Sequence, residues 1–179
     1  MRAYYFDDLP GDPRLPHDSG KPVEDSVLES IGVFIWNIPV HADGTYPVIL
    51  AMGAERGSNN HDVVTVTKES LGDQYDGMLK SFYEEHLHEH EEVRYILEGS
   101  GWFDVRDHAT DSLVRIQLGV GDFMIAPAGI YHRFILDEKN MITAVRMFND
   151  DPKWTPHVRG ESTDANPYRV EYLNNIIVN

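Results

Sequence analysis

The sequence predicts a mainly β protein, an antiparallel sandwich or barrel with a few flanking helices. From residue 93 onward, short β-branched and aromatic segments alternate with turn residues, as in such architectures. The chain has 179 residues, of which 41% are hydrophobic, enough for a substantial core. No repeat or linker divides it. We therefore expect a single domain over 1–179, with an N-terminal arm and helices over about 1–85, a barrel core over about 86–150 and a C-terminal tail over 151–179.

The first half mixes elements of both kinds. Apolar residues at helical spacing predict helices over 23–31 and 72–85, and Gly32 is a plausible end for the first. Apolar or β-branched runs predict strands over 3–6, 33–38 and 61–67. Proline- and glycine-bearing stretches predict irregular segments over 9–22 and 42–60.

The second half is predicted to be almost entirely strand until residue 149. The expected strands are 93–97, 102–106, 113–118, 122–126, 130–136 and 141–148. The segment from Asn149 onward is rich in Pro, Gly and Asp, so we expect a wrapped or loose tail.

Composition excludes several classes of partner and site. With 15 basic and 30 acidic residues the net charge is −15, which argues against nucleic acids and anionic membranes. There is no cysteine, so any metal must be bound by nitrogen and oxygen. No apolar run is long enough to span a bilayer, and the N-terminus does not read as a secretory signal. We expect a soluble intracellular protein.

The pattern His86-x-His88, followed by Glu92, predicts a metal site. Alternate side chains of a strand point the same way, so both imidazoles can face one point, to which Glu92 can return a carboxylate. His132, just after a second turn, is the fourth candidate. Imidazoles and a carboxylate with open positions suit Fe(II), Mn(II) or Ni(II). His88-x-His90 is the competing ligand pair, but the spacing to Glu92 favours His86 with His88.

Strand alternation also predicts the surroundings of the metal. Arg94 and Ile96 share a face with Glu92, and Phe134 shares one with His132. An arginine inside a barrel is costly unless it binds an anion, although a surface ion pair is the alternative for Arg94. We expect an apolar wall beside the metal, formed by Phe82, Ile96, Phe103 and Phe134.

These residues fall into a two-part pattern that resembles the cupin superfamily. The first part is met by His86, His88, Glu92 and Gly99, and the second by Gly121, Pro127, Gly129 and His132. The sequence departs from the pattern at Lys80 and Leu136, both outside the predicted ligands. The resemblance implies a cupin-type antiparallel β-barrel, or jelly roll.

The chain resembles one cupin family most closely, the acireductone dioxygenases of methionine salvage. The resemblance rests on 82–88, 92–107, 127–134, 137–140, the start of the chain and 154–156. It implies cleavage of 1,2-dihydroxy-3-keto-5-methylthiopentene by O2, giving 4-methylthio-2-oxobutanoate and formate with Fe(2+). With Ni(2+) it implies 3-methylthiopropanoate, formate and CO.

The resemblance assigns roles residue by residue. It implies metal ligation by His86, His88, Glu92 and His132, and stabilisation of the anionic substrate by Arg94. It also implies a location in the cytoplasm, with the nucleus as a second compartment, and we expect a monomer. Two competing hypotheses are a ligand-binding cupin without turnover and another cupin enzyme, such as a sugar isomerase. The apolar wall and single arginine fit a sugar poorly.

Overall fold

The computed structural model describes residues 2–151 and 154–177. The strands are β1 (Arg2–Phe6), β2 (Asp18–Pro22), β3 (Phe34–Asn37), β4 (Asn60–Val66), β5 (His86–Leu87), β6 (Glu92–Asp107), β7 (Ser112–Gly119), β8 (Asp122–Ala126), β9 (His132–Leu136), β10 (Ile142–Phe148) and β11 (His157–Val158). The α-helices are α1 (Asp25–Ser30), α2 (Pro47–Glu55), α3 (Lys68–Leu71), α4 (Tyr75–Tyr83), α5 (Glu161–Asp164) and α6 (Pro167–Ile177), and a 3-10 turn (Gly72–Gln74) joins α3 to α4.

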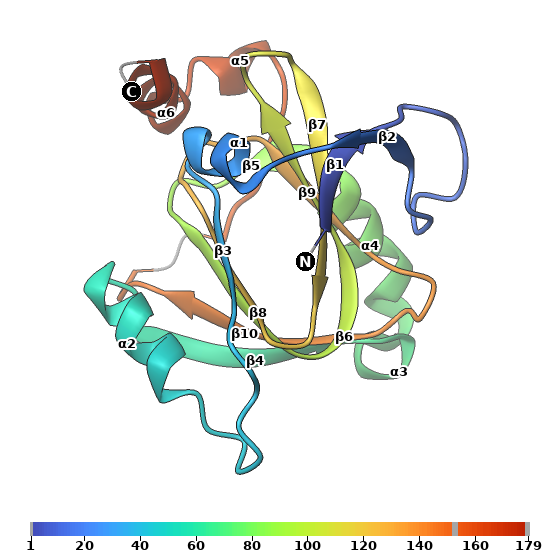
Figure 1. The fold of residues 1–179 in the computed structure, drawn as a ribbon, viewed down its shortest axis with the longest axis vertical. Helices are drawn as coiled ribbons and strands as arrows, with labels where there is room; N and C mark the ends of the chain where they lie inside the picture. The colour runs from blue at the N-terminus through green and yellow to red at the C-terminus, as the bar shows by residue number, and fades with distance from the viewer. Residues whose placement is uncertain (1, 152–153, 178–179) are drawn as a thin grey trace.

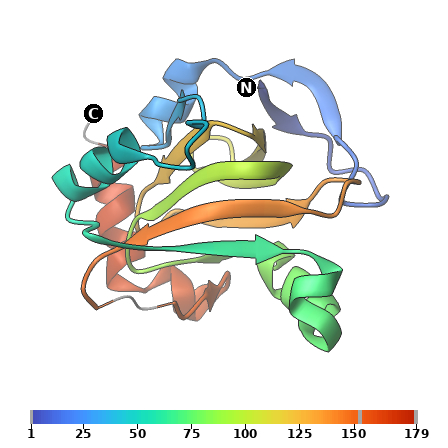
Figure 2. The ribbon, with the colours of Figure 1, turned by 90° about the horizontal axis from the view of Figure 1, so that it is seen from below.

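The strands form an antiparallel barrel, which confirms the predicted cupin-type fold (Figure 1). One face has the strand order β11-β5-β9-β6-β7-β1-β2, and on the other β8 and β10 flank β6, with β3 beyond β8 and β4 beyond β10. Figure 2 shows β4, β10 and β6 side by side, with α3 and α4 at one end of the molecule. β6 belongs to both faces and holds the barrel together.

The change of face within β6 occurs at Gly99. The sequence predicted separate strands over 93–97 and 102–106, but the structure has one strand of 16 residues that bends between them. Gly99 has φ +75°, and a Cβ there would lie 2.1 Å from the carbonyl oxygen of Met141. Only glycine satisfies both conditions, so the predicted break is a bend rather than an end.

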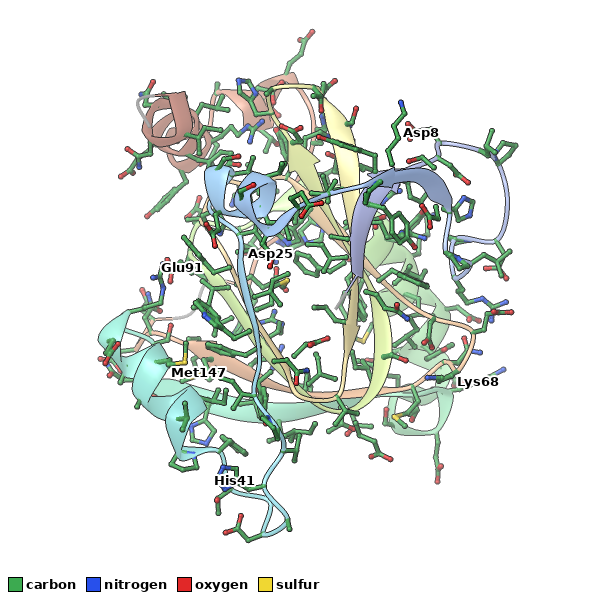
Figure 3. The ribbon with its side chains drawn as sticks, in the orientation of Figure 1. Asp8, Asp25, His41, Lys68, Glu91 and Met147 are labelled. Carbon is green, nitrogen blue, oxygen red and sulfur yellow. The ribbon has the colours of Figure 1, made fainter. Side chains whose placement is uncertain are left out.

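Two apolar layers follow the alternation of β6. Ile96 and Phe103 belong to the cluster that fills the barrel, whereas Val93 and Tyr95 face an outer layer beneath α2. Met147, labelled in Figure 3, belongs to this outer layer and lies against Gly53 of α2. Alternation therefore sends residues 94 and 96 inward, as predicted.

Three segments differ from their prediction. The irregular segment 42–60 contains α2, which begins at Pro47 and buries Ile49 against the outer layer. The predicted arm 9–22 ends in β2, and the tail carries β11, α5 and α6. These elements are stabilised by distant partners, such as the hydrogen bond from the Tyr172 hydroxyl to the Ile31 carbonyl, 3.1 Å. Within the part of the chain that the structure describes, no helix has the length and apolarity that a membrane span requires.

Candidate metal centre

The structure brings the four predicted ligands together at one end of the barrel. His86 opens β5 and is directly paired with His132, the first residue of β9. Their ring centroids are 4.6 Å apart, and the ring of His88 lies 4.9 Å from that of His86 and 5.3 Å from that of His132. One nitrogen from each of the three rings falls in a group within 4.8 Å, the spacing expected around a single metal ion.

Backbone carbonyls fix the orientation of the three imidazoles. The Nδ1 atoms of His86 and His132 lie 2.6 Å and 3.0 Å from the carbonyl oxygens two residues before them, those of Glu84 and Ile130. His88 Nδ1 makes a longer contact, 3.4 Å, to the carbonyl of Thr155. A proton on each Nδ1 leaves Nε2 as the lone-pair atom, the tautomer that a metal-binding histidine commonly uses.

Glu92, the first residue of β6, completes the group with a carboxylate. Its Oε2 atom lies 2.7 Å from His132 Nε2. Both atoms are buried, and neither has a hydrogen-bond partner. Buried polar atoms are normally satisfied, so two such atoms aimed at the same place fit a bound cation. The donors fit the Fe or Ni that the sequence predicts.

The electrostatics of the group also suit a metal. Burial lowers the pKa of His86, and it lowers the pKa of His88 to about 4, so both rings are neutral near pH 7. Burial, the largest single influence, raises the pKa of Glu92, but Arg94, His132 and His88 together outweigh it and hold this pKa well below its usual range. The centre therefore offers neutral imidazoles at His86 and His88 and an ionised carboxylate at Glu92, the protonation states that ligation requires.

Arg94 lies next to the carboxylate on the inner face of β6. Its Nη2 atom is 2.8 Å from Glu92 Oε1, and its Nη1 donates to the carbonyl of Val93 at 2.9 Å. Its side chain is 17% exposed, so the pair is not an ordinary surface ion pair. The guanidinium is held beside the candidate ligand Glu92, where its charge can attract an anionic group.

The predicted apolar wall lies in the core cluster of the barrel, and one of its residues contacts His132. The ring of Phe103 stacks on the imidazole of His132 at 5.2 Å and 13°. Phe82, from α4, and Phe134, from β9, meet edge to face at 6.4 Å. Ile96 is buried in the same cluster, against which both of these phenylalanines pack. All four predicted wall residues therefore belong to one apolar cluster or pack against it.

Two further observations concern His90, the alternative ligand, and the segment 155–159, which the sequence did not place at the site. His90 is outside the group of three imidazoles, and its ring faces that of Trp154 at 6.5 Å. The geometry thus favours His86 with His88.

The sequence did not predict that the segment 155–159 belongs to the site. This segment contacts His88 through Thr155 and pairs with β5. No local pattern marks a contact between residues 67 positions apart.

Comparison with known proteins gives a consistent result along the chain. A family model described as the ARD/ARD' family matches residues 2–156. A Coprinopsis cinerea protein named acireductone dioxygenase 1 is 51% identical over 176 residues, 98% of each chain. A Phaeosphaeria nodorum protein named acireductone dioxygenase is 50% identical over 173 residues, 97% of this chain and 95% of that one.

A solved structure has the same fold. It is described as an acireductone dioxygenase from Bacillus anthracis with a cadmium ion in the active centre. It superposes with a TM-score of 0.64 and 23% identity, and covers 76% of this chain and 91% of that one. At this identity the likeness concerns the fold.

Proposed function

The chain belongs to the ARD/ARD' family, and we propose that it is a metal-dependent dioxygenase that cleaves acireductone, 1,2-dihydroxy-3-keto-5-methylthiopentene, with O2 in methionine salvage. The observation that carries the proposal is the pair of buried atoms Glu92 Oε2 and His132 Nε2, which lack hydrogen bonds and lie beside two further imidazoles. Relatives about half identical over nearly the whole chain carry the same activity in their names.

We propose His86, His88, Glu92 and His132 as the ligands of one Fe(2+) per chain, with Ni(2+) as the alternative metal. The structural neighbour holds cadmium in its active centre, and the group of imidazoles described above supports a metal here too. When bound, the metal would supply a Lewis-acidic and redox-capable centre beside the substrate. Nitrogen and carboxylate donors accept both metals, so availability decides between them.

The other proposed site residues have two roles, stabilisation of the anionic substrate and contact with its apolar tail. Arg94 is the proposed catalytic residue, because its charge is placed to stabilise the deprotonated enediol, the form that reacts with O2. Phe82, Ile96, Phe103 and Phe134 are proposed to contact the methylthio tail and to exclude water from the reacting end. Arg94 and the wall together would orient the substrate, and this orientation would decide which carbons are cleaved.

We propose that the chain acts as one domain and as a monomer in the cytoplasm, with the nucleus as a second compartment. β1, β3 and β4 come from the first 85 residues and pair with barrel strands, which supports one folding unit. A net charge of −15 disfavours self-association. Gel filtration with light scattering and imaging of the tagged protein test these points. A stable dimer or an exclusively extracellular protein would contradict them.

The activity is tested by anaerobic reconstitution of metal-free protein. Fe(II) or Ni(II) is added separately, acireductone is supplied, O2 is admitted and products are analysed. We expect 4-methylthio-2-oxobutanoate and formate with iron, and 3-methylthiopropanoate, formate and CO with nickel. Substrate loss no faster than the spontaneous reaction, in protein shown to hold either metal, would leave a ligand-binding cupin without turnover.

A further inference from the structure

The strand that carries His86 is short and makes a single ladder pair with the barrel. β5 has two residues, and its pairing with β9 consists of the single pair His86 and His132. Its other edge is covered by β11, in which His157 is opposite Leu87 and Val158 is opposite His86. We call residues 155–159 the C-terminal strap. The strap provides more pairs to this strand than the barrel does.

The strap contacts the ligand segment on both sides of these pairs. The Arg159 backbone N–H donates to the Glu85 carbonyl at 2.9 Å, one residue before His86. Thr155 supplies the carbonyl that faces His88 Nδ1. His157 Nε2 lies 3.2 Å from Glu89 Oε1. The segment that contains two proposed ligands therefore has the strap along its whole length.

The Glu85 carboxylate joins the strap to the barrel. Arg159 Nη1 lies 3.2 Å from its Oε2, and Arg159 Nη2 donates to Asp111 Oδ1 at 2.9 Å. The same carboxylate accepts from Arg106 Nε at 2.8 Å and from Arg106 Nη2 at 2.6 Å. The Arg106 backbone N–H donates to the carbonyl of Tyr131, the residue before His132, at 2.8 Å. Glu85 is thus connected to both ligand-bearing segments.

We propose that Arg159 and Glu85 are positioning residues for the metal centre, which hold β5 against the barrel so that His86 and His88 keep their places relative to His132. The inference rests on the metal centre proposed above. Arg159 lies outside residues 2–156, the part matched by the family model. Groups that orient metal ligands from behind typically change metal affinity by about 10- to 100-fold. An ion pair as exposed as this one contributes little to global stability, so the effect should appear in metal retention.

The test compares release of Ni(II) from Arg159→Ala and from a matched control. Arg14→Ala removes the same charge from a side chain that is 38% exposed, against 35% for Arg159, and that is likewise paired with a carboxylate, that of Asp12. Release to the chelator 4-(2-pyridylazo)resorcinol is followed by absorbance, and no substrate is present. We expect release about tenfold faster in Arg159→Ala, near-parental release in Arg14→Ala, and partial recovery in Arg159→Lys.

A thermal melt of each metal-free variant separates positioning from folding. We expect the melting temperature of Arg159→Ala to stay close to that of Arg14→Ala while their release rates differ. Equal release rates in these two variants would overturn the proposal. If Arg159→Ala does not fold, a parental release rate in Arg159→Gln, which removes the charge but keeps a polar side chain, would overturn it instead. A parent that binds no Ni(II) overturns both the metal centre and this inference, whereas a parent that binds Ni(II) without turnover contradicts only the proposed activity.

Discussion

Two buried arginine–carboxylate centres lie on β6, and they differ in whether every acceptor is used. At Asp104, which is 1% exposed, both oxygens accept: Oδ1 from Arg115 Nε at 2.7 Å, and Oδ2 from Arg115 Nη2 at 2.9 Å and Arg133 Nε at 2.8 Å. At Glu92, Oε1 is paired with Arg94 at 2.8 Å, but Oε2 has no hydrogen bond. Both centres bury charge, but of the two carboxylates only that of Glu92 has an oxygen without a hydrogen bond.

The Asp104 centre fixes structure. Arg115 Nη1 donates to the carbonyls of Pro13 and Leu15 at 3.1 Å and 2.7 Å, and its guanidinium lies 4.5 Å from the ring centre of Phe6. These contacts fasten the irregular segment before β2 to the outside of the barrel. A charge network whose contacts are internal to the protein has a structural role, whereas the unsatisfied oxygen of Glu92 fits the metal proposed above.

One atom of the Asp104 centre also lacks a hydrogen bond, and its surroundings explain the difference. Arg133 Nη2 is buried without a partner, but the guanidinium lies 4.2 Å from the ring centre of Tyr83 and 4.8 Å from that of Phe6. Aromatic faces attract a cation and compensate for part of the missing hydrogen bonds. Among the described residues, no such aromatic contact is recorded for Glu92 Oε2, whose neighbour is His132 Nε2 at 2.7 Å.

The largest effect on stability should come from Asp104→Asn. The substitution leaves two buried or half-buried guanidinium groups without a counter-charge, which costs about 3–5 kcal/mol of the free energy of unfolding. Urea unfolding of the metal-free protein measures it, and metal stoichiometry of the folded fraction should be unchanged. A loss of less than about 1 kcal/mol would contradict the structural role of the Asp104 centre.

Glu92→Gln should mainly weaken metal binding, whereas Asp104→Asn should mainly lower stability. Loss of a ligand carboxylate should weaken metal affinity by more than about 100-fold, since even residues behind the ligands change it by 10- to 100-fold. The metal-free protein should lose less stability than Asp104→Asn, because Arg94 keeps its bond to the Val93 carbonyl and some access to water. Competition titration with a chelator and urea unfolding provide the two values. Metal affinity equal to that of the parent would mean that Glu92 is not a ligand.

Arg94→Ala should separate substrate binding from metal binding. A hydrogen bond to a charged group contributes about 1.5–3 kcal/mol, so kcat/KM for acireductone should fall by roughly 10- to 150-fold. Metal content should remain that of the parent, because Arg94 contacts the ligand Glu92 rather than the metal. Steady-state kinetics on protein of measured metal content tests this. Unchanged kcat/KM would mean that Arg94 serves as the ion-pair partner of Glu92 and does not bind the substrate.

The smallest effect should come from Asp62→Asn, at an ion pair that solvent reaches. Arg146, 2.6 Å away, lowers the pKa of the Asp62 carboxyl below its ordinary value of 3.8. The folded state binds this proton less tightly than the unfolded state, so the stabilisation is present above about pH 4 and is lost as pH falls through the lowered pKa. With a side chain 42% exposed, the loss at pH 7 should be under about 1 kcal/mol. The stabilities of parent and variant should converge as the pH falls through the lowered pKa of Asp62, and a difference that stays constant with pH would contradict the assignment.

The sequence predicted most of the fold and the grouping of site residues because both follow local periodicity. Alternation in β6 places Glu92, Arg94 and Ile96 on one face, and the turn before β9 brings His132 opposite His86. The family resemblance added the roles of these residues, which alternation alone does not provide.

The parts that the sequence did not predict depend on distant contacts. α2 has a Pro47 start but a weak apolar periodicity, and it is stabilised by the outer layer that Ile49 enters. β11 is two residues long and exists through its pairing with β5. The tail was predicted from its Pro, Gly and Asp content, yet α6 is held by Tyr172 and by Arg169, whose Nη1 donates to the Gly129 carbonyl at 3.1 Å. Amino-acid composition does not indicate contacts between residues that are distant in the sequence.

The central claim is that three imidazoles and one carboxylate bind a single metal, and X-ray absorption of the Fe(II)-loaded protein tests it most directly. The parent and His90→Gln should give the same spectrum, with three imidazole ligands and only oxygen or nitrogen neighbours. His88→Gln should lose one imidazole or fail to retain iron. Fewer than three imidazoles in the parent, or a loss of one in His90→Gln, would contradict the account.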